Sequence, residues 1–373
     1  MFQRTRTILL WLHRWVGLAA ALLIVVVAGS GVFLVFENEI DRLLNPGLFY
    51  VKAAGQRLPV DQLVASVRQA FPKERVQNVA FPASDGLAVQ TMLGTGKRVS
   101  VDPYTGRVLG SRPFNDSVAY QLRQLHVRLL MPPVKVPMGK GTRTVPNKLG
   151  SQIVGWTTVI LLGISITGMF VWFPRMAWKL DMRTGWKRIN FDLHNLTGLY
   201  TLIFAIALAV TGIVMSFDAP AQWIYAMFPA QEVVDEEAAP SVELQRGAKM
   251  ISFDSVIEAA RKTFPTAWIY SVSMRLPGDT TISGQTRVTI HPYTGEVLSR
   301  ETSRKEQTAA KIIRLMRPIH TGEVFGWPSR IVMALASAMI VAQVVTGVIM
   351  WIVRSFKRKR KTPSPEPREE VAV

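Results

Sequence analysis

Histidine is the residue type in this sequence whose placement best suits chemistry. Four of the five histidines, His13, His126, His194 and His320, lie close to the ends of long apolar segments. An ionisable residue is costly inside a bilayer and marks a functional site there by default. Imidazole is also a common axial ligand of haem iron. Two symmetric pairs of histidines therefore predict two haems, stacked across a membrane, with each iron held by one histidine from each side.

The chain contains no cysteine. This absence excludes iron–sulfur clusters, thiol redox chemistry, disulfides and haem attached through a Cys-x-x-Cys-His motif. If the protein carries electrons, other side chains must hold its cofactor. Histidine is then the obvious choice, and the cofactors are expected to be two haems of the b type.

Four segments without a charged side chain are long enough to cross a bilayer, which requires about 20 apolar residues. They cover residues 16–36, 150–173, 195–217 and 331–353. The first is longer than the apolar core of a secretory signal, about 7–15 residues, so we expect it to be retained as a transmembrane helix. The two long intervening segments hold most of the charge and are expected to form a water-exposed domain.

The net charge of +18 follows the predicted topology. Basic residues flank one side of all four spans: Arg4, Arg6 and Arg14; Arg175, Lys179, Arg183, Lys187 and Arg188; Arg354, Lys357, Arg358, Lys359, Arg360 and Lys361. The positive-inside rule places both termini in the cytoplasm and the two large loops outside it, in the periplasm for a Gram-negative source. Anionic lipid is the expected partner of these clusters, and no nucleic-acid motif accompanies them.

The sequence repeats itself. Residues 101–109 (VDPYTGRVL) recur as residues 290–298 (IHPYTGEVL), and a His-x-x-x-Gly-Leu motif begins at both His13 and His194. Both halves run in the same direction, and such parallel repeats are related by a pseudo-twofold axis along the membrane normal. The axis predicts that His13 faces His194 near the cytoplasmic side and that His126 faces His320 near the outer side.

Each span also carries a pair of small residues at a matching position. The pairs are Ser30-Gly31, Thr167-Gly168, Thr211-Gly212 and Thr346-Gly347. At about 1.5 Å per residue, the pairs of spans one and three lie near the outer haem, and those of spans two and four near the inner haem. Small residues let a flat macrocycle approach a helix backbone. Ordinary helix packing in membranes favours the same residues and is a compatible alternative.

Two further residues have open roles. Arg14 is adjacent to His13 and is a candidate partner for a haem propionate, although snorkelling to lipid headgroups would explain it equally. His291 takes the place of Asp102 in the repeat, next to a Pro-Tyr-Thr-Gly turn, and we interpret it as structural. Of the outer pair, His126 is expected on an amphipathic surface helix and His320 in a loop before the last span.

The intervening segments read as α+β modules. The first has helical apolar spacing over residues 60–70, then strands over 75–81, 87–93 and 98–101. The second predicts a helix over 253–264 and strands over 268–276, 280–290 and 295–298. In both modules Pro-Tyr-Thr-Gly is expected to form a turn between the last two strands.

The predicted fold is thus membrane α-helical, with four transmembrane helices in two parallel pseudo-twofold repeats. Two inserted modules are expected to form one extracytoplasmic α+β domain. The predicted segments are 1–36 (first span), 37–148 (first periplasmic module), 149–175 (second span), 176–190 (cytoplasmic loop), 191–217 (third span), 218–328 (second periplasmic module), 329–354 (fourth span) and 355–373 (basic, then disordered tail).

These spans, with their His-x-x-x-Gly-Leu and Pro-Tyr-Thr-Gly-x-Val-Leu motifs, resemble the PepSY-associated transmembrane helix family over residues 5–355. Some members are di-haem ferric-siderophore reductases of the FoxB type in the bacterial inner membrane. The resemblance implies a PepSY-like external domain and an oxidoreductase that reduces Fe(III)-siderophore on the periplasmic side, which releases the iron. It also implies that the haem-iron ligands are the matching residues His13, His126, His194 and His320.

The sequence carries no Gly-x-Gly-x-x-Gly fingerprint for flavin or nicotinamide. The electron donor must therefore be external, either a quinol or a cytoplasmic reductase. Two alternatives remain at this stage. One is a siderophore or metal transporter, which pseudo-symmetric halves would suit. The other is a non-catalytic membrane sensor or a module resembling a peptidase inhibitor. Neither alternative requires histidine pairs.

Overall fold

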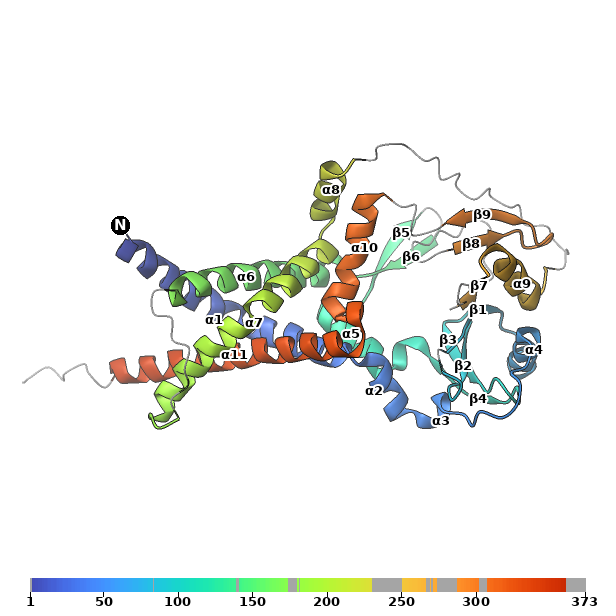
Figure 1. Cartoon of the computed structure of the whole chain (residues 1–373), viewed down its shortest axis with the longest axis horizontal. Coiled ribbons are helices and arrows are strands. Elements are labelled where there is room, and N and C mark those ends of the chain that lie inside the picture. Colours follow the sequence, from blue (N-terminus) through green and yellow to red (C-terminus); the bar gives the residue numbers. More distant parts are fainter. Residues whose placement is uncertain are drawn as a thin grey trace, which may run out of the picture. The chain divides into compact units, whose positions relative to one another are not determined.

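The structure, a computed structural model, describes residues 2–82, 84–138, 141–173, 180, 182–229, 250–265, 269, 271–273, 287–301 and 307–359. The disordered tail predicted over 362–373, the basic residues Arg175 and Lys179, and most of the strands predicted over 268–276 and 280–290 lie outside these residues. The chain divides into two compact units (Figure 1). One comprises Met1–Val35, Leu122–Trp223 and Leu315–Val373, and the other comprises Phe36–Gln121 and Ile224–Arg314.

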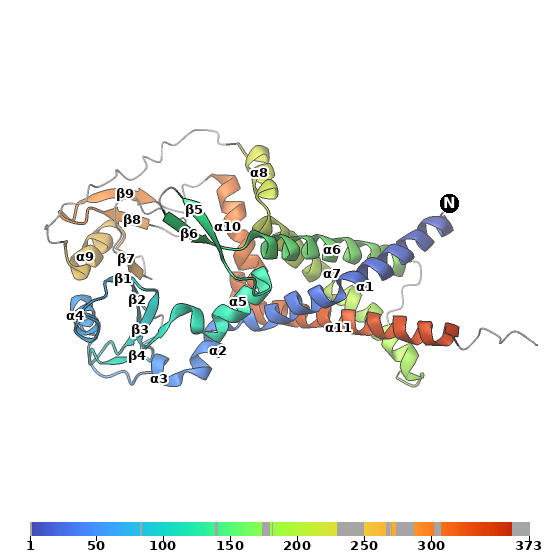
Figure 2. The same ribbon diagram turned by 180° about the vertical axis from the view of Figure 1, so that it is seen from behind.

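Four long helices dominate the first unit and run side by side in both views (Figures 1 and 2). They are α1 (Phe2–Leu34), α6 (Lys148–Trp172), α7 (Trp186–Ser216) and α11 (Trp327–Lys359). Each is long and apolar enough to cross a membrane. Large apolar side chains such as Leu22 and Ile203 are more than 70% exposed, as expected of surfaces that face lipid. The chain is a multi-pass membrane protein.

The packing of these helices places α1 and α7 at opposite corners of the bundle. Each of them packs against both α6 and α11. The core between them is built partly from alanines, Ala20 and Ala28 of α1 and Ala205 of α7, together with Ile24 and Ile340. Small side chains let helix backbones approach closely, which is how helices associate in a bilayer.

The helices extend beyond the apolar segments that predict them. Helix α1 begins at Phe2 and α7 at Trp186, so His13 and His194 lie inside helices and not at their ends. Helix α11 continues to Lys359. A hydropathy pattern marks only the part of a helix that lipid surrounds, and here no proline or glycine interrupts the polar extensions.

Several shorter elements lie wholly or partly in the first unit. Helix α5 (Val118–Arg128) carries His126, and α10 (Thr308–Thr321) carries His320. A hairpin, β5 (Val134–Met138) and β6 (Gly141–Val145), follows α5, while α8 (Asp218–Met227) follows α7. The prediction of a loop at His320 is wrong. Helix α10 continues through Pro318 and ends at Thr321, and the following residue, Gly322, has a φ of 76°, the left-handed conformation that glycine adopts easily.

An antiparallel sheet organises the second unit, in the order β4-β3-β2-β1-β7. Its strands are β1 (Val76–Ala80), β2 (Val89–Leu93), β3 (Lys97–Val101), β4 (Val108–Pro113) and β7 (Ser271–Ser273). Helix α4 (Val60–Ala70) buries Leu63, Val64 and Val67 against this sheet, beside α9 (Phe253–Thr263). A separate hairpin joins β8 (Arg287–Ile290) and β9 (Val297–Glu301). Helices α2 (Glu37–Leu44) and α3 (Pro46–Phe49) precede α4.

The two inserted modules contribute to one unit through two kinds of contact. Strand β7 of the second module pairs with β1 of the first, with Val79 opposite Val272. Helices α4 and α9 also exchange N-terminal caps. Asp254 accepts hydrogen bonds from the amides of Val60 and Asp61, and Asp61 accepts hydrogen bonds from the amides of Phe253 and Asp254. Each carboxylate satisfies amides that a helix leaves without partners at its first turn.

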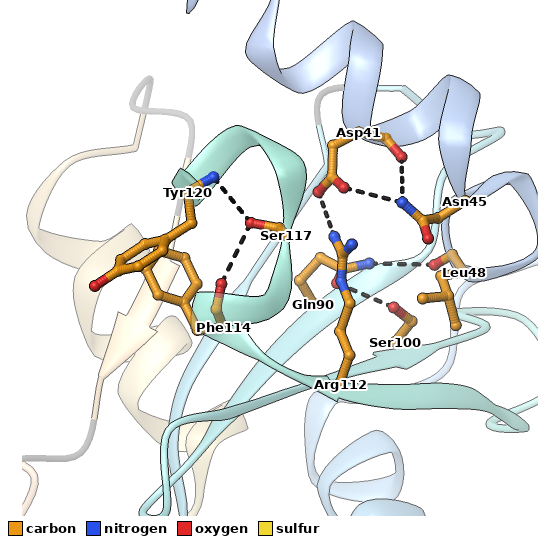
Figure 3. Close-up of polar contacts among 9 residues, drawn as sticks. All are labelled: Asp41, Asn45, Leu48, Gln90, Ser100, Arg112, Phe114, Ser117 and Tyr120. Carbon is orange, nitrogen blue, oxygen red and sulfur yellow. Dashed lines mark hydrogen bonds and ion pairs between the residues drawn. The ribbon is translucent and has the colours of Figure 1, made fainter. Parts of the chain in front are cut away.

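A buried ion pair fixes α2 to the edge strand β4 (Figure 3). The Arg112 guanidinium donates to the Asp41 carboxylate, and the two side chains are 16% and 7% exposed. Asn45 donates to the same carboxylate (3.1 Å), which closes the network on the helix side. Few of these polar atoms meet water, so the pair holds α2 in one position against the sheet.

Candidate functional site

The helical unit brings the four predicted histidines together in two pairs. The rings of His13 on α1 and His194 on α7 have centres 6.3 Å apart and planes inclined at 83°. The rings of His126 on α5 and His320 on α10 have centres 6.1 Å apart and planes inclined at 64°. The partners within each pair are those that the internal repeat predicts.

Helices α6 and α11, which do not carry His13 or His194, hold the rings of these two histidines in place. The Nδ1 atom of His13 lies 3.0 Å from the carbonyl oxygen of Ile164 and 3.3 Å from the hydroxyl of Thr167, both on α6. The Nδ1 atom of His194 lies 3.0 Å from both the Gln343 carbonyl oxygen and the Thr346 hydroxyl, on α11. Each ring is thus oriented by a backbone carbonyl and a threonine of a neighbouring helix.

The His126–His320 pair follows the same pattern with the remaining two helices. The Nδ1 atom of His126 lies 2.8 Å from the Val27 carbonyl oxygen and 3.2 Å from the Ser30 hydroxyl of α1. The Nδ1 atom of His320 lies 2.9 Å from the Thr211 hydroxyl of α7. Thus α1 and α7 each carry one histidine and hold another with a hydroxyl.

These contacts fix which ring nitrogen carries the proton. Each of the four hydroxyls donates its own hydrogen to a carbonyl of its helix, such as Thr211 to Ala207 (2.6 Å) and Thr346 to Ala342 (2.8 Å). The hydroxyl oxygen and the nearby carbonyl can then only accept from the ring, so Nδ1 carries the hydrogen. In the described part of the chain, Nδ1 makes every hydrogen bond of these rings. The lone pair on Nε2 is left for a ligand.

The four glycines of the small pairs lie directly against the histidine rings. A Cβ added at Gly168 would lie 3.0 Å from Cε1 of His13, and one at Gly347 would lie 3.2 Å from Cε1 of His194. The corresponding distances are 3.2 Å from Gly31 to His126 and 3.5 Å from Gly212 to His320. The sequence predicts these pairs as neighbours of a macrocycle. The structure gives them a more specific position, in which the Ser or Thr bonds the ring and the glycine makes room for it.

The ring separations suit a metal ion between the rings. A bond from a metal to an imidazole nitrogen is about 2 Å long and that nitrogen lies about 1.1 Å from its ring centre, so trans imidazoles have centres about 6.2 Å apart. Both observed values, 6.3 and 6.1 Å, agree with this separation. Within the described residues, no group of three or more His, Cys, Asp or Glu side chains could hold a metal ion by itself. Two imidazoles that face each other could hold the iron of a haem, because the porphyrin would supply the other four ligands.

The pair outside the four spans is also in the protonation state that a metal requires. Burial lowers the pKa of His126, with a smaller effect of Arg123. Burial, and secondarily His126, lowers the pKa of His320 to about 4. Both rings are therefore neutral at pH 7, and a neutral imidazole is the form that binds metal.

Two predicted residues lie apart from the histidine pairs. The Arg14 side chain is exposed, with its guanidinium 5.4 Å from the ring centre of Trp15. Among the residues that the structure describes, no hydrogen bond joins the Arg14 side chain to a paired histidine. His291 accepts hydrogen bonds at Nδ1 from the amides of Tyr293 and Thr294, as Asp102 does from Tyr104 and Thr105. His291 therefore closes a turn in the second unit, as its place in the repeat predicts.

Other residues near the site escape sequence reasoning. The carbonyls of Val27, Ile164 and Gln343 hold the rings, and a backbone acceptor leaves no mark in the sequence. Asp192 of α7 is 2% exposed and pairs with Arg188 at 2.9 Å. Asn190 donates from Nδ2 to the carbonyl oxygen of Thr346 (3.0 Å). A signal for Asn190 exists, because it lies one helical turn before His194.

No curated protein matches the chain. The model of the PepSY-associated TM region family matches residues 10–354, which includes all four spans and all four paired histidines. The chain therefore belongs to the PepSY-associated transmembrane family.

Proposed function

We propose that this protein is a di-haem oxidoreductase of the bacterial inner membrane that reduces Fe(III)-siderophore on the periplasmic side. One observation carries the proposal: the four histidines form two pairs, whose ring centres are 6.3 and 6.1 Å apart. In each ring, Nδ1 is hydrogen-bonded to a neighbouring helix. Two imidazoles are too few ligands for a zinc ion, which takes four, whereas haem iron would receive four further ligands from the porphyrin. The siderophore as substrate rests on the resemblance to FoxB-type reductases.

His13 and His194 would hold one haem b through their Nε2 atoms, and His126 and His320 would hold the other. Haem supplies reversible one-electron chemistry at iron. The hydroxyls of Ser30, Thr167, Thr211 and Thr346 hold the ligand rings. A hydrogen bond to Nδ1–H raises the basicity of the ligand and sets the potential of the iron that it binds.

The protein contributes two properties to this reaction. It fixes the ligands on rigid helices, so little reorganisation accompanies a change of charge at the iron. It also separates the two pairs: His13 and His194 lie on the spans α1 and α7, whereas His126 and His320 lie on the shorter helices α5 and α10. Under the proposed topology, with both termini cytoplasmic, the first pair is the inner one and the second faces the periplasm.

The transporter alternative has weaker support. Many secondary transporters bind substrate near the bilayer midplane, typically at discontinuous helices. Within the described residues, α1, α6, α7 and α11 are continuous helices. Asp192 is a buried carboxylate of α7, but it is paired with Arg188 within its own helix.

The visible spectrum of the purified full chain tests the proposal. We expect the Soret and α bands of low-spin haem b, and a pyridine-haemochrome assay that gives two haems per chain. Haem reduced by dithionite should be reoxidised when a ferric trihydroxamate is added, with the Fe(II) trapped by a colorimetric chelator. A colourless protein that was expressed with an ample haem supply would overturn the proposal. Haem that is not reoxidised by any ferric chelate would remove the siderophore part alone.

A further inference from the structure

A cavity of about 180 Å³ lies between α7 and α11. Its lining residue Asn190 precedes His194 by one turn of α7. Its lining residues are Trp186, Lys187, Asn190, Phe191, Ile349, Met350, Val353 and Arg354. Trp186 and Arg354 are exposed, so the cavity reaches the surface of the helix bundle. None of the paired histidines lines it.

The size and lining of the cavity suit a substituted six-membered ring. A cavity of about 150 Å³ lined by apolar side chains holds a benzene molecule. Here Phe191, Ile349 and Val353 supply apolar surface, and the indole of Trp186 adds a flat face. Ligand sites in proteins have this composition, an apolar wall with a few polar groups that fix orientation.

The polar group of the cavity is an acceptor. Asn190 uses its Nδ2 to donate to the Thr346 carbonyl oxygen, which fixes the amide orientation. In the described part of the chain, Asn190 Oδ1 makes no hydrogen bond. A ring that carries a hydroxyl could donate to it. Lys187 and Arg354 also line the cavity and add positive charge to it. Positive charge stabilises an oxyanion, so it favours the loss of a proton from a bound hydroxyl.

The cavity is also linked to the histidine that it neighbours. Asn190 bonds the backbone of Thr346, and the hydroxyl of Thr346 holds the Nδ1 atom of His194 (3.0 Å). One turn of helix is about 5.4 Å, so a ring in the cavity would lie close to this histidine. A redox-active ligand gains from such proximity, whereas a purely structural lipid does not.

We propose that this cavity binds the head group of a membrane quinol, which is the electron donor of the protein. The inference rests on the proposed function. Oxidation of one quinol to the quinone releases two electrons and two protons. Reduction of one Fe(III) chelate to Fe(II) consumes one electron, so one quinol serves two ferric ions. The protons leave to the water on the side of Lys187 and Arg354.

Binding of duroquinone to the full chain in detergent, measured by equilibrium dialysis, tests this assignment independently of activity. The variant Met350→Trp fills the cavity, and we expect it to weaken binding by about tenfold or more. The matched control is Ile352→Trp on the same helix, because Ile352 is exposed and does not line the cavity. The control should bind as the unmodified protein does. Haem content should be equal in all three.

Several results would overturn the inference. One is equal duroquinone binding by Met350→Trp and Ile352→Trp, or no saturable binding by the unmodified protein. Another is haem loss from Met350→Trp alone, which would assign the cavity to the porphyrin edge. Loss of binding to phosphatidylglycerol vesicles in Met350→Trp, with duroquinone binding intact, would assign it to lipid. The two proposals can be told apart. A colourless protein that binds duroquinone refutes the haem reductase, and with it the quinol as its electron donor, but leaves the cavity as a quinone-binding site. A haem protein that does not bind duroquinone refutes only the quinol site.

Discussion

The imidazole of His13 lies directly against Gly168: a Cβ added to this glycine would be 3.0 Å from Cε1, so the ring would have to move to make room for it. Each of the other three paired histidines has a glycine at a comparable position. Close packing of this kind fixes the direction in which Nε2 points.

We therefore predict that Gly168→Ala displaces the His13 ring and lowers occupancy of the haem at the His13–His194 pair. The measurement is haem per chain and the low-spin absorption bands. Gly163→Ala on the same helix is the matched control, because a Cβ there meets nothing within 4 Å. The control should retain two haems and gain a little helix stability, up to about 1 kcal/mol. Equal haem content in both variants would contradict the role given to Gly168.

Replacement of a paired histidine should remove one haem and leave the other. We expect His13→Ala and His194→Ala, and equally His126→Ala and His320→Ala, to fall from two haems per chain to one in a pyridine-haemochrome assay. His291→Ala should keep both, because His291 closes a turn in the second unit. Two haems in any of the four paired variants would count against the ligand assignment.

The hydroxyls that contact histidine Nδ1 should change the midpoint potential of the haem iron, and the amount of haem bound should stay the same. In Thr346→Val the Nδ1–H of His194 keeps only the Gln343 carbonyl as an acceptor. A ligand with a weaker hydrogen bond is less basic and stabilises Fe(III) less. We expect the midpoint potential of that haem to rise by a few tens of millivolts. Thr346→Ser keeps the hydroxyl and should restore the potential in a spectroelectrochemical titration.

The Asp41–Arg112 pair should matter for stability because it is buried. Arg112→Met leaves the carboxylate without its charge partner, and breaking such a pair costs about 3–5 kcal/mol. Arg57→Met is the control, since the Arg57–Asp85 pair has side chains 36% and 80% exposed and an exposed pair contributes about 1 kcal/mol at most. The stability lost in each variant is measured by chemical unfolding of the full chain, with proteolysis of the second unit as the readout of unfolding. Similar losses would show that burial does not decide the effect.

The exchanged caps of α4 and α9 predict sensitivity to acid. Burial on its own raises the pKa of Asp61, but contacts with Asp254 and hydrogen bonds from Ser252 and the Phe253 and Asp254 amides outweigh it and lower the pKa. A lowered pKa in the folded state means that the stabilisation is present above the unfolded value, about 3.9, and is lost as the pH falls below it. Asp61→Asn should reduce stability at pH 7 and flatten the loss below about pH 4. Parallel pH profiles for both proteins would contradict this account.

Much of the architecture follows from local sequence. Charge-free segments predict the four spans, and the turn motif at residues 102–106 predicts the end of β3, where Asp102 caps the turn and Gly106 has a φ of 73°. The repeat also predicts which histidine faces which. These features depend on hydropathy, on turn chemistry and on symmetry, all of which a sequence records directly.

Only the tertiary structure decides how the pairs are held. The sequence predicts Ser30, Thr167, Thr211 and Thr346 as neighbours of a cofactor, but their contacts with histidine Nδ1 depend on helix rotation and on side chains distant in the chain. The carbonyl acceptors have no side-chain signature, because backbone groups are the same at every position. The cavity at Asn190 depends on how α7 packs against α11, because both helices contribute side chains to its lining. Residue type and spacing determine which side chains are available for chemistry in this protein, and helix packing determines which of their atoms face one another.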